Sequence, residues 1–251
     1  MNLWGLLSAD PWWQAVLLNT ILGGMALVLP RKALTTWGII HAWFLGILLW
    51  GCLGWRGYVV MFAYLVLGTA VTYVGKDIKE AKGIAEKRSG ARGPENLWGS
   101  AAVGALCAIG YFYQPHPLWL LGYVASVATK LADTFGSEIG KAYGKHTFLI
   151  TDIQMRSVPA GTEGAVSREG LLASIIGSLL IVGLGLWLGL ITLLNIKDVV
   201  VASFIAVNLE SVLGATLQSR WQWLTNEVVN AINTAIGATL AVVFTLLFPN
   251  L

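Results

Sequence analysis

Charged residues are clustered along the chain and leave long uncharged, largely apolar stretches between them. Six stretches carry no Asp, Glu, Lys or Arg, and they cover residues 11–30, 33–55, 57–75, 96–129, 170–196 and 228–251. A helix that crosses a bilayer core of roughly 30 Å needs about 20 consecutive apolar residues. All of these stretches except 96–129 therefore have the length of one membrane-spanning helix each.

The stretch 96–129 is long enough for more than one span. It contains Gln114-Pro115-His116-Pro117, where two prolines remove amide donors and break helical geometry. We therefore expect one span before this turn and another after it. The second of these continues through Lys130, Asp133 and Glu138.

A further span is expected over residues 199–219, where only Asn208 and Glu210 interrupt the apolar pattern. The pattern as a whole predicts an all-α fold, a polytopic integral membrane bundle of about eight transmembrane helices. We expect residues 1–251 to form a single transmembrane domain.

Composition supports a membrane protein and excludes a soluble domain. Hydrophobic residues make up 56% of the chain and charged residues only 12%, whereas soluble domains carry about 25% charged residues. Cys52 and Cys107 fall inside different predicted spans, so no disulfide is expected. The sequence shows no zinc-ligand spacing, no G-x-S-x-G elbow and no basic patch of the kind that binds nucleic acid.

The distribution of Lys and Arg predicts the orientation, because cytoplasmic loops retain these residues. With both termini on the non-cytoplasmic side, 13 basic residues are cytoplasmic, Arg56 and Lys197 are not, and Lys130 lies within a span. Two long polar segments, 76–96 and 140–170, then form cytoplasmic loops, where functional groups tend to collect. No cleavable signal is recognisable before the first span, so we expect that span to be retained.

Ionisable residues inside predicted spans are functional candidates, because a charge in lipid is costly without a partner or a wet cavity. The acidic candidates are Asp133, Glu138, Glu210 and Glu227. At 100° per residue, Lys130, Thr134, Glu138 and Lys141 share one face of a helix, with Asp133 close beside it. This face is consistent either with a structural Lys130–Asp133 ion pair or with acidic metal ligands beside cationic phosphate contacts.

Amide side chains accompany the two carboxylates of the last spans. Asn208 precedes Glu210, while Asn226 and Asn230 form a helical stripe next to Glu227. Such stripes are also typical of hydrogen bonds that hold membrane helices together, and both interpretations remain open.

The segment 159–167, PAGTEGAVS, has glycines that permit close backbone approach to an anion and hydroxyls that can donate to one. It is also compatible with an ordinary turn. Together with many basic residues and several carboxylates suited to Mg²⁺, it favours phosphoryl transfer, in which positioning and charge neutralisation supply most of the catalysis.

Five blocks of the sequence resemble a known membrane family. They are GIAEKRSGARGPEN (83–96, preceded by Lys79-Glu80-Ala81), TKLADTFGSEIGKAYGK (129–145), PAGTEGAVSREG (159–170), NLESVLGATLQ (208–218) and LTNEVVNAINTAIGA (224–238). The chain is similar over these blocks to the family that contains the phytyl-phosphate kinase of the plant vitamin E pathway.

The resemblance implies an enzyme that converts phytyl monophosphate to phytyl diphosphate for tocopherol and phylloquinone synthesis. It implies a nucleoside triphosphate donor, expected to be CTP, with Mg²⁺ as cofactor. No long transit peptide precedes the first span, so we expect a cyanobacterial or similar bacterial form, in a plasma or thylakoid membrane.

Residue roles follow by position. The expected catalytic residues are Asp133, Glu138, Lys141 and Arg92. The expected nucleotide and phosphate contacts are Lys79, Glu86, Lys87, Arg88, Arg92, Lys130, Lys145, Gly161, Thr162, Gly164 and Ser167. A polar pocket is expected from Asn208, Glu210, Asn226, Glu227 and Asn230, and the metal ligands from Asp133, Glu138 and Glu210.

Two other functions remain open from the sequence. One is a CTP-dependent kinase that acts on free phytol or a polyprenol, with Asp133 as general base. The other is a transporter or flippase of phosphorylated lipids that uses the same polar residues as a pathway.

Overall fold

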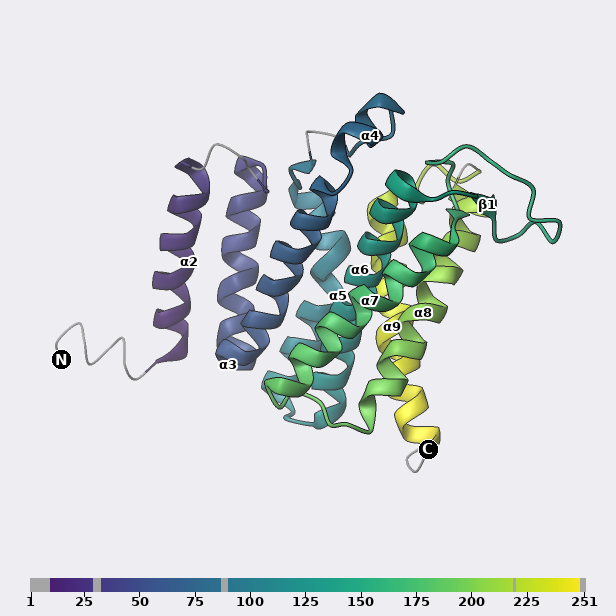
Figure 1. Cartoon of the computed structure of the whole chain (residues 1–251). Coiled ribbons are helices and arrows are strands. Elements are labelled where there is room, and N and C mark those ends of the chain that lie inside the picture. The colour runs from purple at the N-terminus through teal and green to yellow at the C-terminus, as the bar shows by residue number, and fades with distance from the viewer. Residues whose placement is uncertain (1–9, 29–32, 87–89, 219, 249–251) are drawn as a thin grey trace.

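The computed structural model describes residues 10–28, 33–86, 90–218 and 220–248, and these form a bundle of long helices (Figure 1). The helices are α2 (Pro11–Val28), α3 (Thr36–Tyr73), α4 (Lys76–Ala81), α5 (Pro94–Tyr113), α6 (Pro117–Tyr143), α7 (Arg168–Trp187), α8 (Asn195–Leu213) and α9 (Asn226–Leu247). Helix α8 passes directly into a π-helical turn, η2 (Gly214–Gln218). The predicted helical fold is confirmed, and it carries one unpredicted antiparallel strand pair, β1 (Phe148–Leu149) with β2 (Ala165–Val166).

Helix α3 consists of two helical halves that fold back on each other. Gly54 separates them with a φ of 68° and a ψ of −172°, a backbone conformation that glycine tolerates and other residues do not. Figure 1 shows the first half descending to this bend and the second half rising from it towards α4. The two halves correspond to the predicted spans 33–55 and 57–75.

Helix α6 lies at the centre of the bundle, in contact with α3, α5, α7, α8 and α9. It begins at Pro117, directly after the His116 cap, whose side chain accepts a hydrogen bond from the Leu118 amide. The predicted proline break between two helices is therefore confirmed. Because residues 121–132 of α6 are all buried, the functional groups that follow them are held on a rigid element.

Glycines on the neighbouring helices allow this close packing. A Cβ at Gly177 of α7 would lie 2.8 Å from the Leu131 carbonyl oxygen, and one at Gly237 of α9 would overlap the Thr129 side chain. Small residues at helix crossings let backbones approach in a membrane, where lipid tails compete for the same apolar surfaces.

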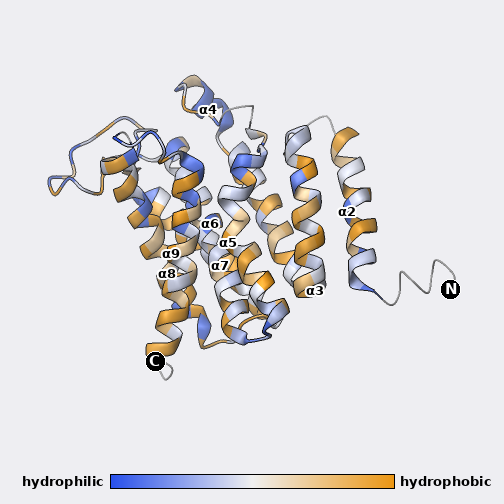
Figure 2. Ribbon diagram, turned by 180° about the vertical axis from the view of Figure 1, so that it is seen from behind, coloured by the Kyte–Doolittle hydropathy of each residue, from blue (hydrophilic) through white to orange (hydrophobic). Residues whose placement is uncertain are grey.

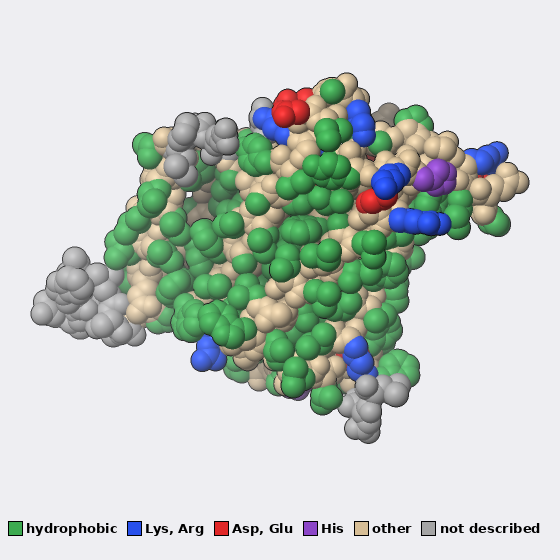
Figure 3. Space-filling model, viewed as in Figure 1, with side chains coloured by type: hydrophobic (Ala, Val, Ile, Leu, Met, Phe, Trp, Pro, Cys, Tyr) green, Lys and Arg blue, Asp and Glu red, His purple; other side chains and the backbone are tan. Residues whose placement is uncertain are grey.

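Five of the described helices are long and apolar enough to cross a membrane: α2, α3, α7, α8 with η2, and α9. Figure 2 shows apolar residues along the helices and hydrophilic residues gathered towards the end that carries α4. In Figure 3 most Lys, Arg, Asp and Glu side chains in view lie at this end, which also carries β1 and which we call the charged end.

The two long polar segments of the sequence lie at the same end of the bundle. The described parts of segments 76–96 and 140–170 are at the charged end (Figure 1). Arg56 follows the Gly54 bend, and Lys197 lies in the first turn of α8, both at the opposite end.

Candidate active site

A group of buried and half-buried polar side chains lies where α6, α8 and α9 meet. We call it the central charge cluster: Lys130, Asp133, Glu210, Asn230 and Asn233. The Lys130 ammonium donates to the Asp133 carboxylate, three residues later on α6, and to Asn230 Oδ1 at 2.6 Å. The predicted Lys130–Asp133 ion pair is therefore present. Asn230, which accepts a hydrogen bond from the same ammonium, joins α9 to α6.

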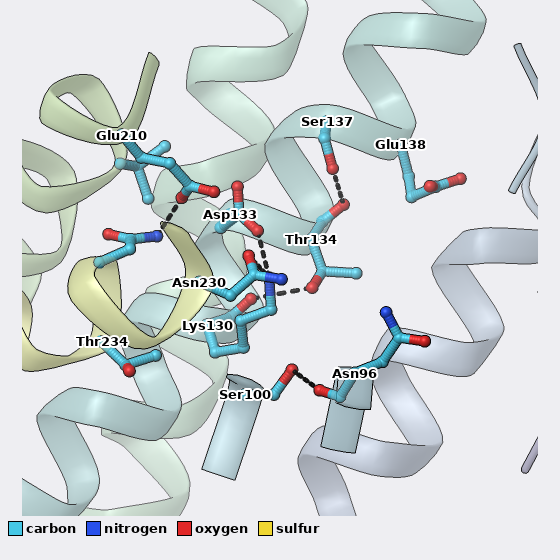
Figure 4. Close-up of polar contacts among 12 residues, drawn as sticks. Asn96, Ser100, Lys130, Asp133, Thr134, Ser137, Glu138, Glu210, Asn230 and Thr234 are labelled. Atoms are coloured by element: carbon cyan, nitrogen blue, oxygen red, sulfur yellow. Dashed lines mark hydrogen bonds and ion pairs between the residues drawn. The ribbon is translucent and has the colours of Figure 1, made fainter. Parts of the chain in front are cut away.

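Glu210 brings a second carboxylate into this cluster from α8. It accepts a hydrogen bond from Asn233 Nδ2, and Figure 4 shows its carboxylate beside that of Asp133. The cluster then holds two carboxylates and one ammonium. Asn233 Oδ1 is buried and has no hydrogen-bond partner among the described residues. Excess negative charge and an unpartnered oxygen give the cluster the capacity to accept a cation.

The second long loop packs against the turn that follows Glu210. Gly164 has a φ of 76°, and a Cβ there would lie 2.3 Å from the Ser211 carbonyl oxygen. Glu163 lies within electrostatic reach of Glu210. The π-helical turn η2 follows at once on α8, and such widened turns are frequent at functional sites.

The hydroxyls of this loop are engaged locally, which corrects part of the predicted anion turn. Thr162 Oγ1 donates to the Pro159 carbonyl at 2.7 Å, and Ser167 Oγ caps α7 by accepting from the Gly170 amide. Gly161 packs against Ile84 from the first long loop. The two loops therefore meet, but the Thr162 and Ser167 side chains serve the turn itself.

A second set of charges, which we call the outer ion-pair cluster, consists of Lys79, Glu86, Glu138 and Lys141. The Lys79 ammonium is almost fully buried and donates to the Glu138 carboxylate and to the Thr72 carbonyl. Lys141 donates to Glu86 at 2.9 Å and lies 3.9 Å from Glu138. These contacts fix α4 and the chain after it to the charged end of α6.

Glu86 shows the electrostatic consequence of this arrangement. Burial alone would disfavour its charged form, but the Lys141 ammonium outweighs that effect and holds the pKa of Glu86 below its ordinary value. Glu86 is therefore ionised at neutral pH.

The expected three-carboxylate metal site is not formed. No three His, Cys, Asp or Glu side chains among the described residues are arranged to hold a metal ion. Glu138 pairs instead with Lys79, because both side chains are buried and each neutralises the other. Asp133 and Glu210 remain together as the acidic pair.

An apolar cavity of about 590 Å³ lies between α2, the two halves of α3, and α5. Arg92 lines it, with its guanidinium carbon 5.0 Å from the centre of the Tyr64 ring and a terminal nitrogen close to Gly68. Within the described part of the chain, no carboxylate forms an ion pair with Arg92. This cation is therefore available to a ligand.

The cavity adjoins the central charge cluster. Tyr64 and Ser100 both line it, and Tyr64 lies within electrostatic reach of Lys130. Figure 4 shows Ser100 and Asn96 of α5 on the side of Lys130 and Thr134. An apolar chamber thus ends at a group of charges, the combination that an amphiphile with an anionic head requires.

The other predicted site residues lie apart from the central charge cluster. Asn208 donates to the Phe204 carbonyl of its own helix at 2.7 Å, and Asn226 is exposed at the start of α9, so neither forms part of the predicted pocket. Glu227 accepts from Asn96 at 3.1 Å and joins α9 to α5. Lys145 is exposed in the loop after α6.

Lys87 and Arg88 lie outside the described residues. The sequence analysis missed Asn233, Tyr64 and Ser100. Asn233 lies one turn after Asn230, a spacing that could have marked it. Nothing in the pattern distinguishes Tyr64 and Ser100 from other packed residues.

Comparison with known proteins defines the class to which this architecture belongs. The chain is a member of the integral membrane protein family DUF92, which it matches over residues 19–238. The family resemblance predicted from the sequence blocks is therefore confirmed.

Individual relatives extend over almost the whole chain. A membrane protein of Synechocystis is 57% identical over 244 residues, which cover 96% of this chain and 94% of the relative. The chloroplast protein VTE6 of Arabidopsis thaliana is 43% identical over 246 residues, with 94% and 72% covered. A membrane protein of Methanocaldococcus jannaschii is 32% identical over 222 residues, with 87% and 89% covered. No solved structure matches the chain.

Proposed function

We propose that this protein is a Mg²⁺-dependent prenyl-phosphate kinase. It transfers the terminal phosphoryl group of a nucleoside triphosphate, with CTP as the expected donor, to phytyl monophosphate, and the phytyl diphosphate serves tocopherol and phylloquinone synthesis. The observation that carries the proposal is the apolar cavity whose Arg92 end adjoins the central charge cluster. The similarity to VTE6 along most of the chain supports the assignment to the vitamin E pathway.

The cavity and Arg92 bind different parts of the acceptor molecule. The prenyl tail lies among the apolar side chains, and the phosphate lies against the Arg92 guanidinium, whose planar fork can bind two oxygens at once. Lys141, at the charged end of α6, faces the side from which a water-soluble nucleotide arrives. Lys82, which donates to the Lys141 carbonyl, adds a second positive charge there.

The central charge cluster fits Mg²⁺ by its donor chemistry. Asp133 and Glu210 offer adjacent carboxylates, and Asn233 Oδ1 is a buried oxygen with no partner among the described residues. Mg²⁺ is usually held by one or two carboxylates, with phosphate oxygens and waters completing its shell. When bound, the ion would offset the repulsion between the two anionic substrates.

Transfer requires little covalent chemistry from the protein. An oxygen of the acceptor phosphate attacks the terminal phosphorus of the donor, a new P–O bond forms, and the nucleoside diphosphate leaves as the bond to its bridging oxygen breaks. Because the attacking oxygen is already anionic, no strong general base is required. Arg92 holds the acceptor, and Lys141 and Lys82 attract the anionic donor, so positioning and charge supply the catalysis. The acidic pair would hold the Mg²⁺ that screens the two anions.

We further propose an orientation in the membrane. In this proposal α2, the two halves of α3, and α5 to α9 all cross the bilayer, which makes eight spans; among them, α2, α3, α7, α8 with η2, and α9 have the length and hydropathy of membrane spans. The charged end is cytoplasmic and both termini are non-cytoplasmic, in a plasma or thylakoid membrane.

One assay tests the reaction. Purified protein in detergent is incubated with Mg²⁺, γ-labelled CTP and either phytyl phosphate or phytol. We expect labelled phytyl diphosphate from the phosphate and no labelled product from the alcohol. Product from phytol alone would identify an alcohol kinase, and movement of phytyl phosphate across vesicles without any product would identify a transporter.

A further inference from the structure

We infer that the Tyr64 hydroxyl is a second contact for the anionic head group, beside the Arg92 guanidinium, and that it makes the cavity selective for a phosphomonoester over the corresponding alcohol. This assignment rests on the proposed function for the identity of the lipid. Its test measures binding and needs no turnover.

Tyr64 supports the Arg92 side chain on the wall of the cavity. The guanidinium carbon lies 5.0 Å from the centre of the Tyr64 ring, and a Cβ on Gly68 would lie 2.7 Å from Arg92 Nη2. Gly68 follows Tyr64 by one helical turn on the same face of α3, so a side chain there would displace the guanidinium from the ring. The ring and the bare backbone of Gly68 therefore give Arg92 a defined position beside Tyr64.

The Tyr64 hydroxyl has no hydrogen-bond partner among the described residues, although the residue is only 5% exposed. Two other hydroxyls that line the cavity are paired, because Tyr58 donates to Asn19 at 3.0 Å and Ser100 donates to a carbonyl of its own helix at 2.8 Å. Thr69 Oγ1 also lacks a partner, but it is completely enclosed, whereas the Tyr64 oxygen is not. An unpaired buried donor is costly, so a ligand oxygen that pairs with the Tyr64 hydroxyl gains binding energy.

The charges near this hydroxyl favour an anion. Arg92 offers five N–H donors and no acceptor, and no carboxylate forms an ion pair with it within the described ranges. Lys130 lies within electrostatic reach of Tyr64, but Asp133 and Asn230 already accept from its ammonium. Arg92 and the Tyr64 hydroxyl are thus the donors left for a ligand, and a phosphate has oxygens for both.

A phenol in this position distinguishes a phosphate from an alcohol. Its hydroxyl is neutral but donates to an anionic oxygen in a charge-assisted hydrogen bond, which is roughly twice as strong as one between neutral groups. The free alcohol carries no charge and forms only the weaker bond. Removal of the hydroxyl should therefore cost the phosphate ligand more than the alcohol.

The experiment measures binding of radiolabelled phytyl phosphate and phytol, titrated separately, to the purified full-length protein without nucleotide. Tyr64→Phe keeps the ring beside Arg92 and removes only the hydroxyl. We expect it to weaken phytyl phosphate by about 10- to 100-fold and phytol by less than about threefold. The unfolding temperature of the ligand-free variant should not fall below that of the wild type, because no hydrogen bond between described residues is lost.

Tyr123→Phe is the matched control. Tyr123 is fully buried in α6, does not line the cavity, and donates from its hydroxyl to the Gly57 carbonyl at 2.7 Å. The same substitution should here have the opposite effects. We expect a lower unfolding temperature and a phytyl phosphate affinity within about twofold of the wild-type value.

Three results would overturn the inference: a wild type that binds phytol as tightly as phytyl phosphate, a Tyr64→Phe variant with the wild-type affinity for phytyl phosphate, or equal losses for both ligands in that variant. The expected binding profile in a protein that transfers no phosphoryl group would instead remove the proposed function and leave the Tyr64 contact intact. Phosphoryl transfer by a protein whose Tyr64→Phe variant binds like the wild type would do the reverse.

Discussion

The Lys130 ammonium binds one carboxylate and one amide, while the neighbouring Glu210 accepts from the Asn233 amide and lies beside Asp133. One ammonium therefore serves two half-buried carboxylates. A carboxylate pair with a single ammonium in these surroundings needs a proton or a further cation. At the scale of single residues, this imbalance is the strongest sign that the central charge cluster does more than hold helices together.

Asp133→Asn tests this interpretation. The amide keeps the shape of the side chain but removes the negative charge, so we expect turnover of phytyl phosphate to fall by about 10² to 10³-fold. The folded state should survive, because Asn230 still accepts from Lys130. Steady-state kinetics, with thermal unfolding of the same preparation in detergent, measure both effects.

Asp198→Asn is the matched control. Asp198 is a buried carboxylate in the first turn of α8, at the end opposite the charged end, and it accepts a hydrogen bond from Thr245. Removal of the Asp198 negative charge should leave turnover near the wild-type value. Equal activity in both variants would remove Asp133 from the active site.

Sequence spacing predicted some of these residues and not others, for a physical reason. Lys130 and Asp133 are neighbours on any α-helix, so their ion pair follows from the i, i+3 relation alone. Asn208 and Asn230 look equivalent in the sequence, yet one bonds to its own helix and the other to α6. That difference depends on which neighbouring helix each faces, and no local pattern contains it.

At the scale of elements, the buried Lys79–Glu138 pair connects the short helix α4 to the bundle. Both side chains are at most 3% exposed. Lys79→Met should lower the free energy of unfolding by about 3–5 kcal/mol, since it removes the hydrogen-bonded cation of a buried carboxylate and leaves it the more distant Lys141 ammonium, at 3.9 Å. The double variant Lys79→Met, Glu138→Leu should recover most of that loss, as measured by thermal unfolding of the four members of the cycle.

Activity in this double variant separates two roles for Glu138. Recovered stability with retained turnover would make Glu138 a positioning residue for α4 and the chain after it. Recovered stability without turnover would support Glu138 as a catalytic acid, as the sequence predicted.

The contact between Glu86 and Lys141 predicts a pH dependence for the segment after α4. The folded-state pKa of Glu86 lies below its ordinary value of 4.5, so the contact contributes fully above that pH. The contribution is lost as the pH falls through the lower folded-state pKa. Because the Glu86 side chain is 44% exposed, we expect less than about 1 kcal/mol.

Hydrogen exchange of residues 82–86 measures this effect. In the wild type, protection should be full above the ordinary glutamate pKa of 4.5 and should fall as the pH drops below it. Glu86→Gln should show the lower protection at every pH. A wild type whose protection stays constant through this range would contradict the assignment.

At the scale of the whole molecule, the charges divide the bundle into two ends, which predicts opposite accessibility for two exposed apolar residues. Ile153, in the second long loop, is 98% exposed, and Leu193, in the turn before α8, is 72% exposed. With Cys52 and Cys107 replaced by alanine, Ile153→Cys should react with a membrane-impermeant thiol reagent only in inverted vesicles. Leu193→Cys should react in intact cells, and the opposite labelling would reverse the proposed orientation.

The helical arrangement was largely predictable at this scale, and the cavity was not. Charges and prolines mark where spans end, so the Pro117 start of α6 and the break near Arg56 follow from the sequence. The chamber lies between α2, α3 and α5, whose apolar residues form no distinguishing pattern. A cavity arises where side chains fail to meet, and that property belongs to packing between helices.

The position of Arg92 links the outermost helix to the head-group site. Helix α2 packs mainly on α3, and the chain that follows α2 is hydrogen-bonded to Arg92, whose amide donates to the Ala33 carbonyl and whose carbonyl accepts from the Thr35 amide. An amphiphile dissolved in the bilayer would enter the chamber from the side on which Met25, Phe62 and Val66 line it, because these side chains are exposed. Ala33 also lines the chamber, so a bound chain that displaces Ala33 would also displace the Arg92 backbone. Binding of the hydrocarbon chain in the cavity and binding of the anionic head at Arg92 would then be coupled.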